Sequence, residues 1–227
     1  MAKCIQRSCV VAMLLMTSVG LADNAQPLSQ LASHQEFLRR LVAAAVERTH
    51  HIVRYDPAYV RIPYPNGDVP EGVGVCTDEI IRIYRAVGID LQKEVHEDMA
   101  KNFSAYPNMR KWRLMRTDTN IDHRRVPNLA VFFRRNGENI ATTTIASYYQ
   151  PGDLVTWDLG SGIPHIGMVV DKKAASGRYM VVHNIGQGPR IEDVLFAWKI
   201  TGHFRYYGHE REQRASNLVS RMFLLPG

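Results

Sequence analysis

The sequence predicts an α+β domain, with helices in its first part and an antiparallel sheet in its second part. Up to Gly137, apolar residues recur at the three- and four-residue spacing of amphipathic helices. Beyond Gln150, short apolar segments rich in β-branched residues are separated by polar turns. Helices that precede a run of strands, instead of alternating with them, are typical of α+β domains.

Helices are expected in four places before the sheet. Their apolar residues recur at helical spacing, and Gly88 is placed to cap the second helix at its C-terminus. The expected ranges are Ser29 or Ser33 to Arg48, Cys76 to Val87, Leu91 to Phe103, and Pro127 to the residue before Gly137. The segment from Asp56 to Gly74 is rich in Pro, Gly and Tyr, and we expect it to form a long ordered loop.

Short apolar segments predict the strands of the sheet. Their ranges are Asp153 to Asp158, Ile166 to Asp171, Tyr179 to Asn184 and His203 to Tyr207, with a short helix expected from Glu192 to Lys199. A hairpin centred on Ala174 would place His165 directly opposite His183 on one face of the sheet. A shift of one residue would send one of these histidines to the other face.

The two ends of the chain differ from the predicted domain, which covers residues 23–207. Residues 1–22 resemble a secretory signal peptide, with Lys3 and Arg7 before a short apolar stretch and a small-residue cleavage site at Gly20 to Ala22. We therefore expect export to the periplasm, with an uncleaved N-terminal anchor as the alternative. Residues 208–227 form a charged tail with an apolar end.

Composition limits the classes of partner. The net charge is +6, but no basic stretch is interleaved with aromatic residues, so a nucleic-acid partner is not expected. Beyond the signal peptide, no segment approaches the length of a membrane span. Cys76 is the only cysteine outside the signal peptide, so an internal disulfide of the exported protein is excluded. Its thiol is either a buried structural group or a reactive one.

A lone cysteine at a predicted helix N-terminus, with two histidines on later strands, suggests covalent catalysis. In this hypothesis Cys76 is the nucleophile, His165 is the general base and acid, and His183 orients the imidazole of His165. The backbone N–H of Cys76 would hold the oxyanion, with Tyr59 or Tyr64 as a second donor. The alternatives are a buried structural cysteine with core histidines, or a zinc site made by the same three residues.

The same residues resemble the NlpC-type branch of papain-like cysteine peptidases, which trim bacterial cell-wall peptides. That family has a cysteine at a helix start, a Pro-Gly-Asp-Leu marker, a His-x-Gly strand and a third polar residue one strand later. Here the matching segments are Cys76, Pro151 to Leu154, His165 to Gly167, and His183. The resemblance implies a papain-like fold in which N-terminal helices pack on an antiparallel sheet.

Longer motifs resemble a bacterial exported family known as domain of unknown function 1287. They are Gly74 to Asp78, Val95 to Met99, Asn120 to Leu129, Pro164 to Gly167, and His183 to Gly186. This resemblance makes the polar residues of these motifs and the loop before them candidates for the wall of a cleft. These residues are Asp78, His96, Asp98, Asp118, Asp122, His123, Arg124 and Arg125. The arginines could clamp a substrate carboxylate, and the alternative is an ion-pair network that holds the loop in place.

The sequence thus predicts a cysteine hydrolase of the cell envelope that cleaves amide bonds in the stem peptides of peptidoglycan or in another peptide. No metal or organic cofactor is expected. An acyltransferase or transpeptidase that uses the same cysteine, and a wall-binding module without catalytic activity, are the alternatives. The oligomeric state is not indicated by the sequence.

Overall fold

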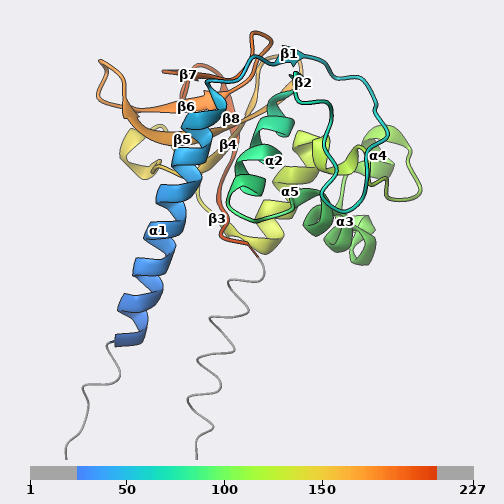
Figure 1. The fold of residues 1–227 in the computed structure, drawn as a ribbon, viewed down its shortest axis with the longest axis horizontal. Helices are drawn as coiled ribbons and strands as arrows, with labels where there is room; N and C mark the ends of the chain where they lie inside the picture. Colours follow the sequence, from blue (N-terminus) through green and yellow to red (C-terminus); the bar gives the residue numbers. More distant parts are fainter. Residues whose placement is uncertain (1–24, 209–227) are drawn as a thin grey trace, which may run out of the picture.

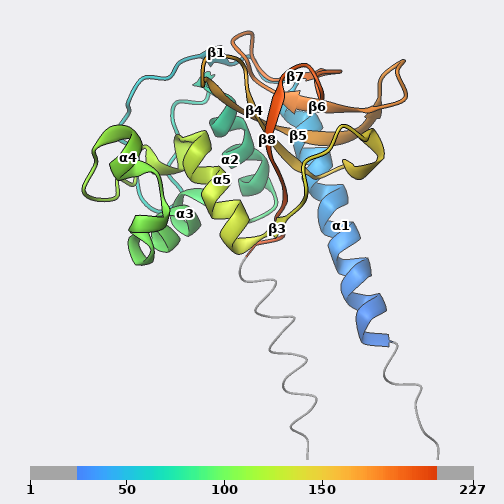
Figure 2. The same cartoon turned by 180° about the vertical axis from the view of Figure 1, so that it is seen from behind.

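The computed structural model describes the backbone of residues 25–208 and the side chains of residues 32–208. Helices and an antiparallel sheet form two layers, with the helices gathered mainly on one face of the sheet (Figure 1; Figure 2 shows the opposite side). The predicted α+β class is therefore correct. The predicted signal peptide and nearly all of the charged tail lie outside the described residues. Among the described residues, no helix has the length and apolar character needed to cross a membrane.

Five α-helices form within the described range, and the boundaries of four agree closely with the sequence. They are α1 (Ala25–Arg48), α2 (Cys76–Ala86), α3 (Leu91–Lys101), α4 (Asn108–Trp112) and α5 (Val126–Asn136). Gly88 follows α2 with a φ of 88°, a left-handed conformation that glycine adopts without strain. Its N–H and that of Ile89 bond back to the last turn of the helix, which ends α2 as predicted.

In the part of the chain that the structure describes, the main sheet has six antiparallel strands in the order β3-β8-β4-β5-β6-β7. Their bounds are β3 (Glu138–Asn139), β4 (Leu154–Asp158), β5 (Pro164–Lys173), β6 (Tyr179–His183), β7 (Arg190–Glu192) and β8 (Lys199–Arg205). Two short strands, β1 (Arg54–Tyr55) and β2 (Val73–Gly74), pair in parallel at the two ends of the predicted loop.

The predicted register of the β5–β6 hairpin was wrong by two residues. Lys173 lies opposite Tyr179, so the turn is centred at Ser176 instead of Ala174. The irregularity between Val169 and Lys173 removes part of this displacement and leaves His183 opposite Gly167 instead of His165. A shift of two residues preserves the side of the sheet to which each side chain points. Both histidines therefore share one face, as the hairpin pattern predicted, but they are diagonal neighbours.

The predicted helix from Glu192 to Lys199 was also wrong. Glu192 ends strand β7, where it pairs with Val181, and a turn follows in which the N–H of Ala197 bonds to Val194. The turn is held because Leu195 is fully buried and its carbonyl accepts a hydrogen bond from the indole of Trp157 at 3.0 Å. Tertiary packing thus overrides the local helical pattern.

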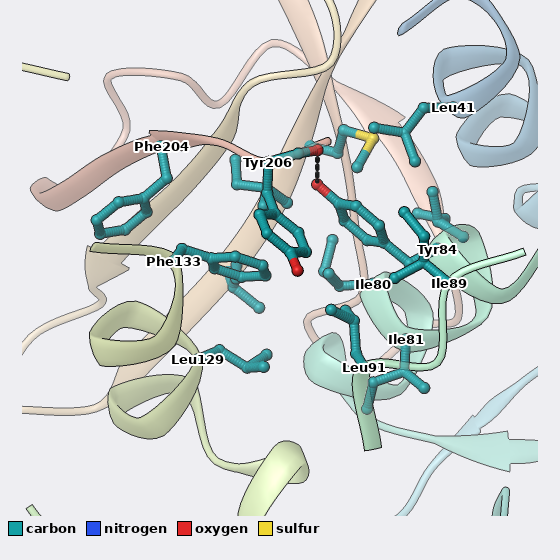
Figure 3. Close-up of a cluster of buried hydrophobic side chains, with 14 of the residues drawn as sticks. Leu41, Ile80, Ile81, Tyr84, Ile89, Leu91, Leu129, Phe133, Phe204 and Tyr206 are labelled. Carbon is teal, nitrogen blue, oxygen red and sulfur yellow. Dashed lines mark hydrogen bonds between the residues drawn. The ribbon is translucent and has the colours of Figure 1, made fainter. Parts of the chain in front are cut away.

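The main core lies between the helices and one face of the sheet. Figure 3 shows its centre, where Tyr84 of α2 meets Tyr206 and the ring of Phe133 from α5. The hydroxyl of Tyr84 donates to the carbonyl of Tyr206 at 3.1 Å, which satisfies a polar group inside an apolar cluster. Helices α1 and α2 contact each other and both contact β5, so the start of α2 is held against this strand.

Gly167, the glycine of the His-x-Gly segment, lets β5 and β6 approach each other closely. A Cβ atom at this position would lie 2.6 Å from Cγ1 of Val181 and 2.9 Å from the carbonyl oxygen of Val182. It would also lie 3.1 Å from Cβ of His183. Any side chain here would push away the strand that carries this histidine.

We predict that Gly167→Ala lowers the free energy of unfolding by about 1–3 kcal/mol, the usual cost of overpacking. Urea denaturation of the variant and the wild type measures the difference. Gly72→Ala is the matched control, because a Cβ there meets no atom of the described residues within 4 Å. This substitution should change stability by less than about 0.5 kcal/mol. Equal effects of the two substitutions would contradict this explanation of the glycine.

Candidate active site

Cys76 is the first residue of helix α2, and its side chain is only 4% exposed. Val75 precedes it in an extended conformation, and the Val75 N–H donates to the carboxylate of Asp78 at 2.7 Å. This bond satisfies an amide at the helix start that has no partner within the helix. The backbone N–H groups of Ile166, Thr77 and Cys76 favour the thiolate form of the sulfur. Because Ile166 follows His165 in β5, the thiol meets the sheet next to this histidine.

The thiol is a neutral group in this environment. Burial is the main cause that raises the pKa of Cys76 to about 12, and the negative charge of Asp78 raises it further. The three backbone N–H groups act in the opposite direction but do not compensate for burial. At neutral pH Cys76 is therefore an un-ionised thiol, which needs a base to become a strong nucleophile.

Tyr55, and not Tyr59 or Tyr64, is the tyrosine beside Cys76. Strand β1 pairs with β2 so that Tyr55 lies opposite Gly74, two residues before the cysteine. Burial raises the pKa of Tyr55 to about 12, with added contributions from Cys76 and Asp78. Its hydroxyl forms a hydrogen bond with the Cys76 thiol, and the residue is 37% exposed. No local sequence signal predicts this parallel pairing of two-residue strands.

The two tyrosines that the sequence suggested make other contacts. The hydroxyl of Tyr59 donates to Asp118 at 3.0 Å and accepts a bond from Asn120 at 2.9 Å. The ring of Tyr64 meets the ring of His96 edge-on, with centroids 5.0 Å apart. Neither has a described contact with Cys76.

His165 and His183 form a buried hydrogen-bonded pair. Nε2 of His165 lies 2.9 Å from Nδ1 of His183, and Nε2 of His183 lies 2.8 Å from a carboxylate oxygen of Glu192. Burial lowers the pKa of His165 to about 3, and the neighbouring His183 lowers it further. Burial also lowers the pKa of His183, although the Glu192 carboxylate opposes this effect. Both rings are therefore neutral at pH 7.

The thiol and the imidazole rings approach β5 from different sides. Trp157 and Trp198 contact the ring of His165 on the sheet face that carries Val169 and Val181. Cys76 belongs to the core on the opposite, helix-covered face. Among the residues with described side chains, no hydrogen bond joins Cys76 to either histidine. The backbone at Ile166 is the link between the two groups.

The charged loop from Asp118 to Arg125 is tied to the start of α2 by a buried ion pair. Nε and Nη2 of Arg124 donate to the two carboxylate oxygens of Asp78 at 2.7 and 3.0 Å, and both side chains are 2% exposed. Arg124 also donates to the carbonyl of Ala58, and its own carbonyl accepts from the hydroxyl of Thr77. These contacts favour the ion-pair alternative for Asp78 and Arg124, because little of Arg124 remains accessible to a substrate carboxylate.

Asp122 also has an internal role. It accepts hydrogen bonds from the backbone N–H of Asp118 and from the amide of Asn108. Arg125 approaches Asp122 at 3.4 Å and places its guanidinium 4.4 Å from the centre of the Trp112 ring. Arg125 is only partly buried, so it remains a candidate for contact with a ligand.

The remaining predicted wall residues lie in the helical layer, and of them His123 is buried whereas His96 and Asp98 are partly exposed. His123 is buried, and burial, followed by the nearby charges of Arg124 and Arg85, lowers its pKa to about 3. Nδ1 of His96 is buried and has no hydrogen-bond partner among residues 32–208. Asp98 accepts hydrogen bonds from Arg135 and Tyr106 and so holds α3 to α5. Within the described residues, no group of three or more His, Cys, Asp or Glu residues could hold a metal ion.

The Pro-Gly-Asp-Leu segment has a structural explanation. The carboxylate of Asp153 receives hydrogen bonds from Nε2 of His203 at 2.7 Å and from Nε of Arg205 at 2.7 Å. Both Asp153 and His203 are fully buried, and the His203 ring stacks on Tyr149. Asp153 therefore fastens the start of β4 to β8, the strand beside it.

Fold and site together define an α+β protein with a candidate thiol site where a helix start meets a sheet. The chain belongs to the family described as Domain of unknown function (DUF1287), which matches residues 42–206. It is 55% identical over 153 residues to the "Uncharacterized protein YijF" of Escherichia coli strain K12. That alignment covers 67% of this chain and 74% of the relative.

A solved structure, that of NlpC1 from Trichomonas vaginalis, is similar to 75% of this chain. The sequences are 15% identical, the TM-score is 0.39, and the chain spans 44% of that protein. A likeness at this level carries no argument about chemistry.

We predict that Arg124→Ala lowers the free energy of unfolding by about 3–5 kcal/mol. The Asp78–Arg124 pair is buried, so the substitution leaves the Asp78 carboxylate buried without its guanidinium partner. Urea denaturation measures the change. Arg39→Ala is the control: the Arg39–Glu36 pair is exposed, so its removal should leave the urea midpoint nearly unchanged. An Arg124 variant as stable as the Arg39 variant would contradict the structural role of this pair.

Proposed function

We propose that this protein is a cysteine hydrolase that cleaves amide bonds, with the stem peptides of peptidoglycan as its substrate. The observation that supports it most is the position of Cys76, at a helix start, beside Tyr55 and next in space to the His165 strand. Residues 1–22, read as a signal peptide, support a location in the cell envelope.

In the proposed reaction, Nδ1 of His165 removes the proton of Cys76 as the sulfur attacks the carbonyl carbon of the scissile amide. This ring nitrogen is the one that the bond to His183 leaves available. The carbonyl oxygen becomes an oxyanion, which the N–H of Cys76 and the hydroxyl of Tyr55 stabilise. The protonated ring then gives its proton to the departing amine, and a thioester with Cys76 remains.

The second half of the reaction restores the thiol. His165 removes a proton from water, and the resulting hydroxide equivalent attacks the thioester carbonyl. The carboxylic acid leaves, and the proton returns to the sulfur. Because the thiol and both rings are neutral before substrate binds, charge separates only during attack. No hydrogen bond among the described side chains joins the thiol to the ring, so the proposal requires the two groups to come together when substrate binds.

The charged loop and the sequence motifs support the substrate class. Arg125 is the partly exposed cation of the charged loop, and a guanidinium recognises a carboxylate with two parallel hydrogen bonds. Peptidoglycan stem peptides are rich in carboxylates. The resemblance of the Cys76, His165 and His183 segments to NlpC-type peptidases favours the same substrate.

We predict that purified protein releases peptide fragments from isolated peptidoglycan, and that Cys76→Ser lowers the rate by about 10³-fold or more. Mass spectrometry identifies the fragments and the new termini. His165→Asn should cause a comparable loss, whereas His50→Asn, which alters an exposed histidine, should cleave as the wild type does. Fragments that are equally abundant with the wild type and Cys76→Ser, or absent with both, would contradict the proposal. Products joined to a new amine instead of gaining water would identify an acyltransferase.

A further inference from the structure

Glu192 extends the chain of hydrogen bonds that begins at His165. It ends strand β7 and pairs with Val181, so it is a diagonal neighbour of His183 on the same face of the sheet. Its carboxylate lies 2.8 Å from Nε2 of His183, and the Glu192 side chain is 40% exposed. The chain therefore runs from the buried ring of His165 through His183 to a group in contact with solvent.

The chemistry of these groups determines where each proton lies. A carboxylate accepts hydrogen bonds and donates none, so Nε2 of His183 must carry a hydrogen. A neutral imidazole has one N–H, and Nδ1 of His183 is therefore an acceptor. Nε2 of His165 must then donate to it, which leaves Nδ1 of His165 without a hydrogen.

We propose that Glu192 is a positioning residue that sets the tautomers of both histidines and keeps the lone pair of His165 Nδ1 free to accept a proton. The inference rests on the proposed role of His165 as the base for Cys76. After proton transfer, His165 would carry N–H groups on both ring nitrogens. The Glu192 carboxylate, one ring away, would stabilise that positive charge through the His183 hydrogen bonds.

A surface ion pair without function is the other explanation of the Glu192 contact. Exposed pairs contribute little to stability and are usually mobile. Here, however, one partner is a histidine that is 1% exposed, and its other ring nitrogen bonds to a second buried histidine. A buried ring with both nitrogens engaged has its orientation fixed, which a surface pair does not require.

Nitrogen-15 NMR of the histidine rings at pH 7.5 tests the inference without any substrate. The wild type should show only the neutral Nε2–H tautomer for both His165 and His183. Glu192→Gln preserves the shape, but an amide can donate as well as accept, so the Nδ1–H tautomer of His183 should become detectable. Asp193→Asn is the matched control: it removes the charge of the next residue, which pairs with Arg178, and should leave both rings unchanged.

Peptide release from peptidoglycan gives the second readout. Glu192→Gln should slow this release by about tenfold or more, because the substitution alters the group that orients the catalytic histidine. An Nδ1–H tautomer of either ring in the wild type would overturn the inference, and so would identical tautomers and rates in Glu192→Gln. If the wild type shows the expected tautomers but releases no peptide, the hydrogen-bond chain stands and the proposed hydrolase function fails.

Discussion

The buried ion pair between Asp78 and Arg124 fixes the start of helix α2, and the geometry of the candidate site depends on it. Asp78 accepts the N–H of Val75 and both guanidinium bonds, so one carboxylate caps the helix and holds the charged loop. Arg124 in turn bonds to Ala58, three residues beyond Tyr55. These hydrogen bonds join the segment at Ala58, the start of α2 and the charged loop, which are distant from one another in the sequence. The negative charge of Asp78 also raises the pKa of Cys76 and so disfavours its thiolate form.

Burial determines the protonation state of the site before any ligand binds. It raises the pKa of the thiol to about 12 and lowers that of His165 to about 3, so both reacting groups are neutral. A site with these properties differs from one that holds a ready thiolate–imidazolium pair. It requires a base that accepts the proton during attack, so the thiol and the imidazole must come together in the substrate complex. Tyr55 and the amides at the helix start can then stabilise charge where it forms.

Local patterns in the sequence predicted most of the fold and only part of the site. Helical spacing and Gly88 located α2, and alternation placed both histidines on one face despite a register error of two residues. Parallel pairing of Tyr55 with Gly74 depends on contacts between distant segments, so it left no local signal. The helix predicted from Glu192 onward concealed that Glu192 ends strand β7 and is the partner of His183. A hairpin reading of the glycine-rich turn between β6 and β7 could have found that partner.

The pH dependence of Cys76 alkylation tests most directly whether the thiol is neutral until a base acts on it. Iodoacetamide labelling is followed at the Cys76 peptide by mass spectrometry, and chain unfolded in guanidinium serves as the reference. A raised pKa means less thiolate at every pH below it, so the rate in folded protein should rise about tenfold per pH unit from pH 7 to 10 without levelling off. The unfolded reference should level off above about pH 9, near the ordinary pKa of cysteine. A plateau in folded protein at or below pH 7 would show a pre-formed thiolate and would contradict the neutral site.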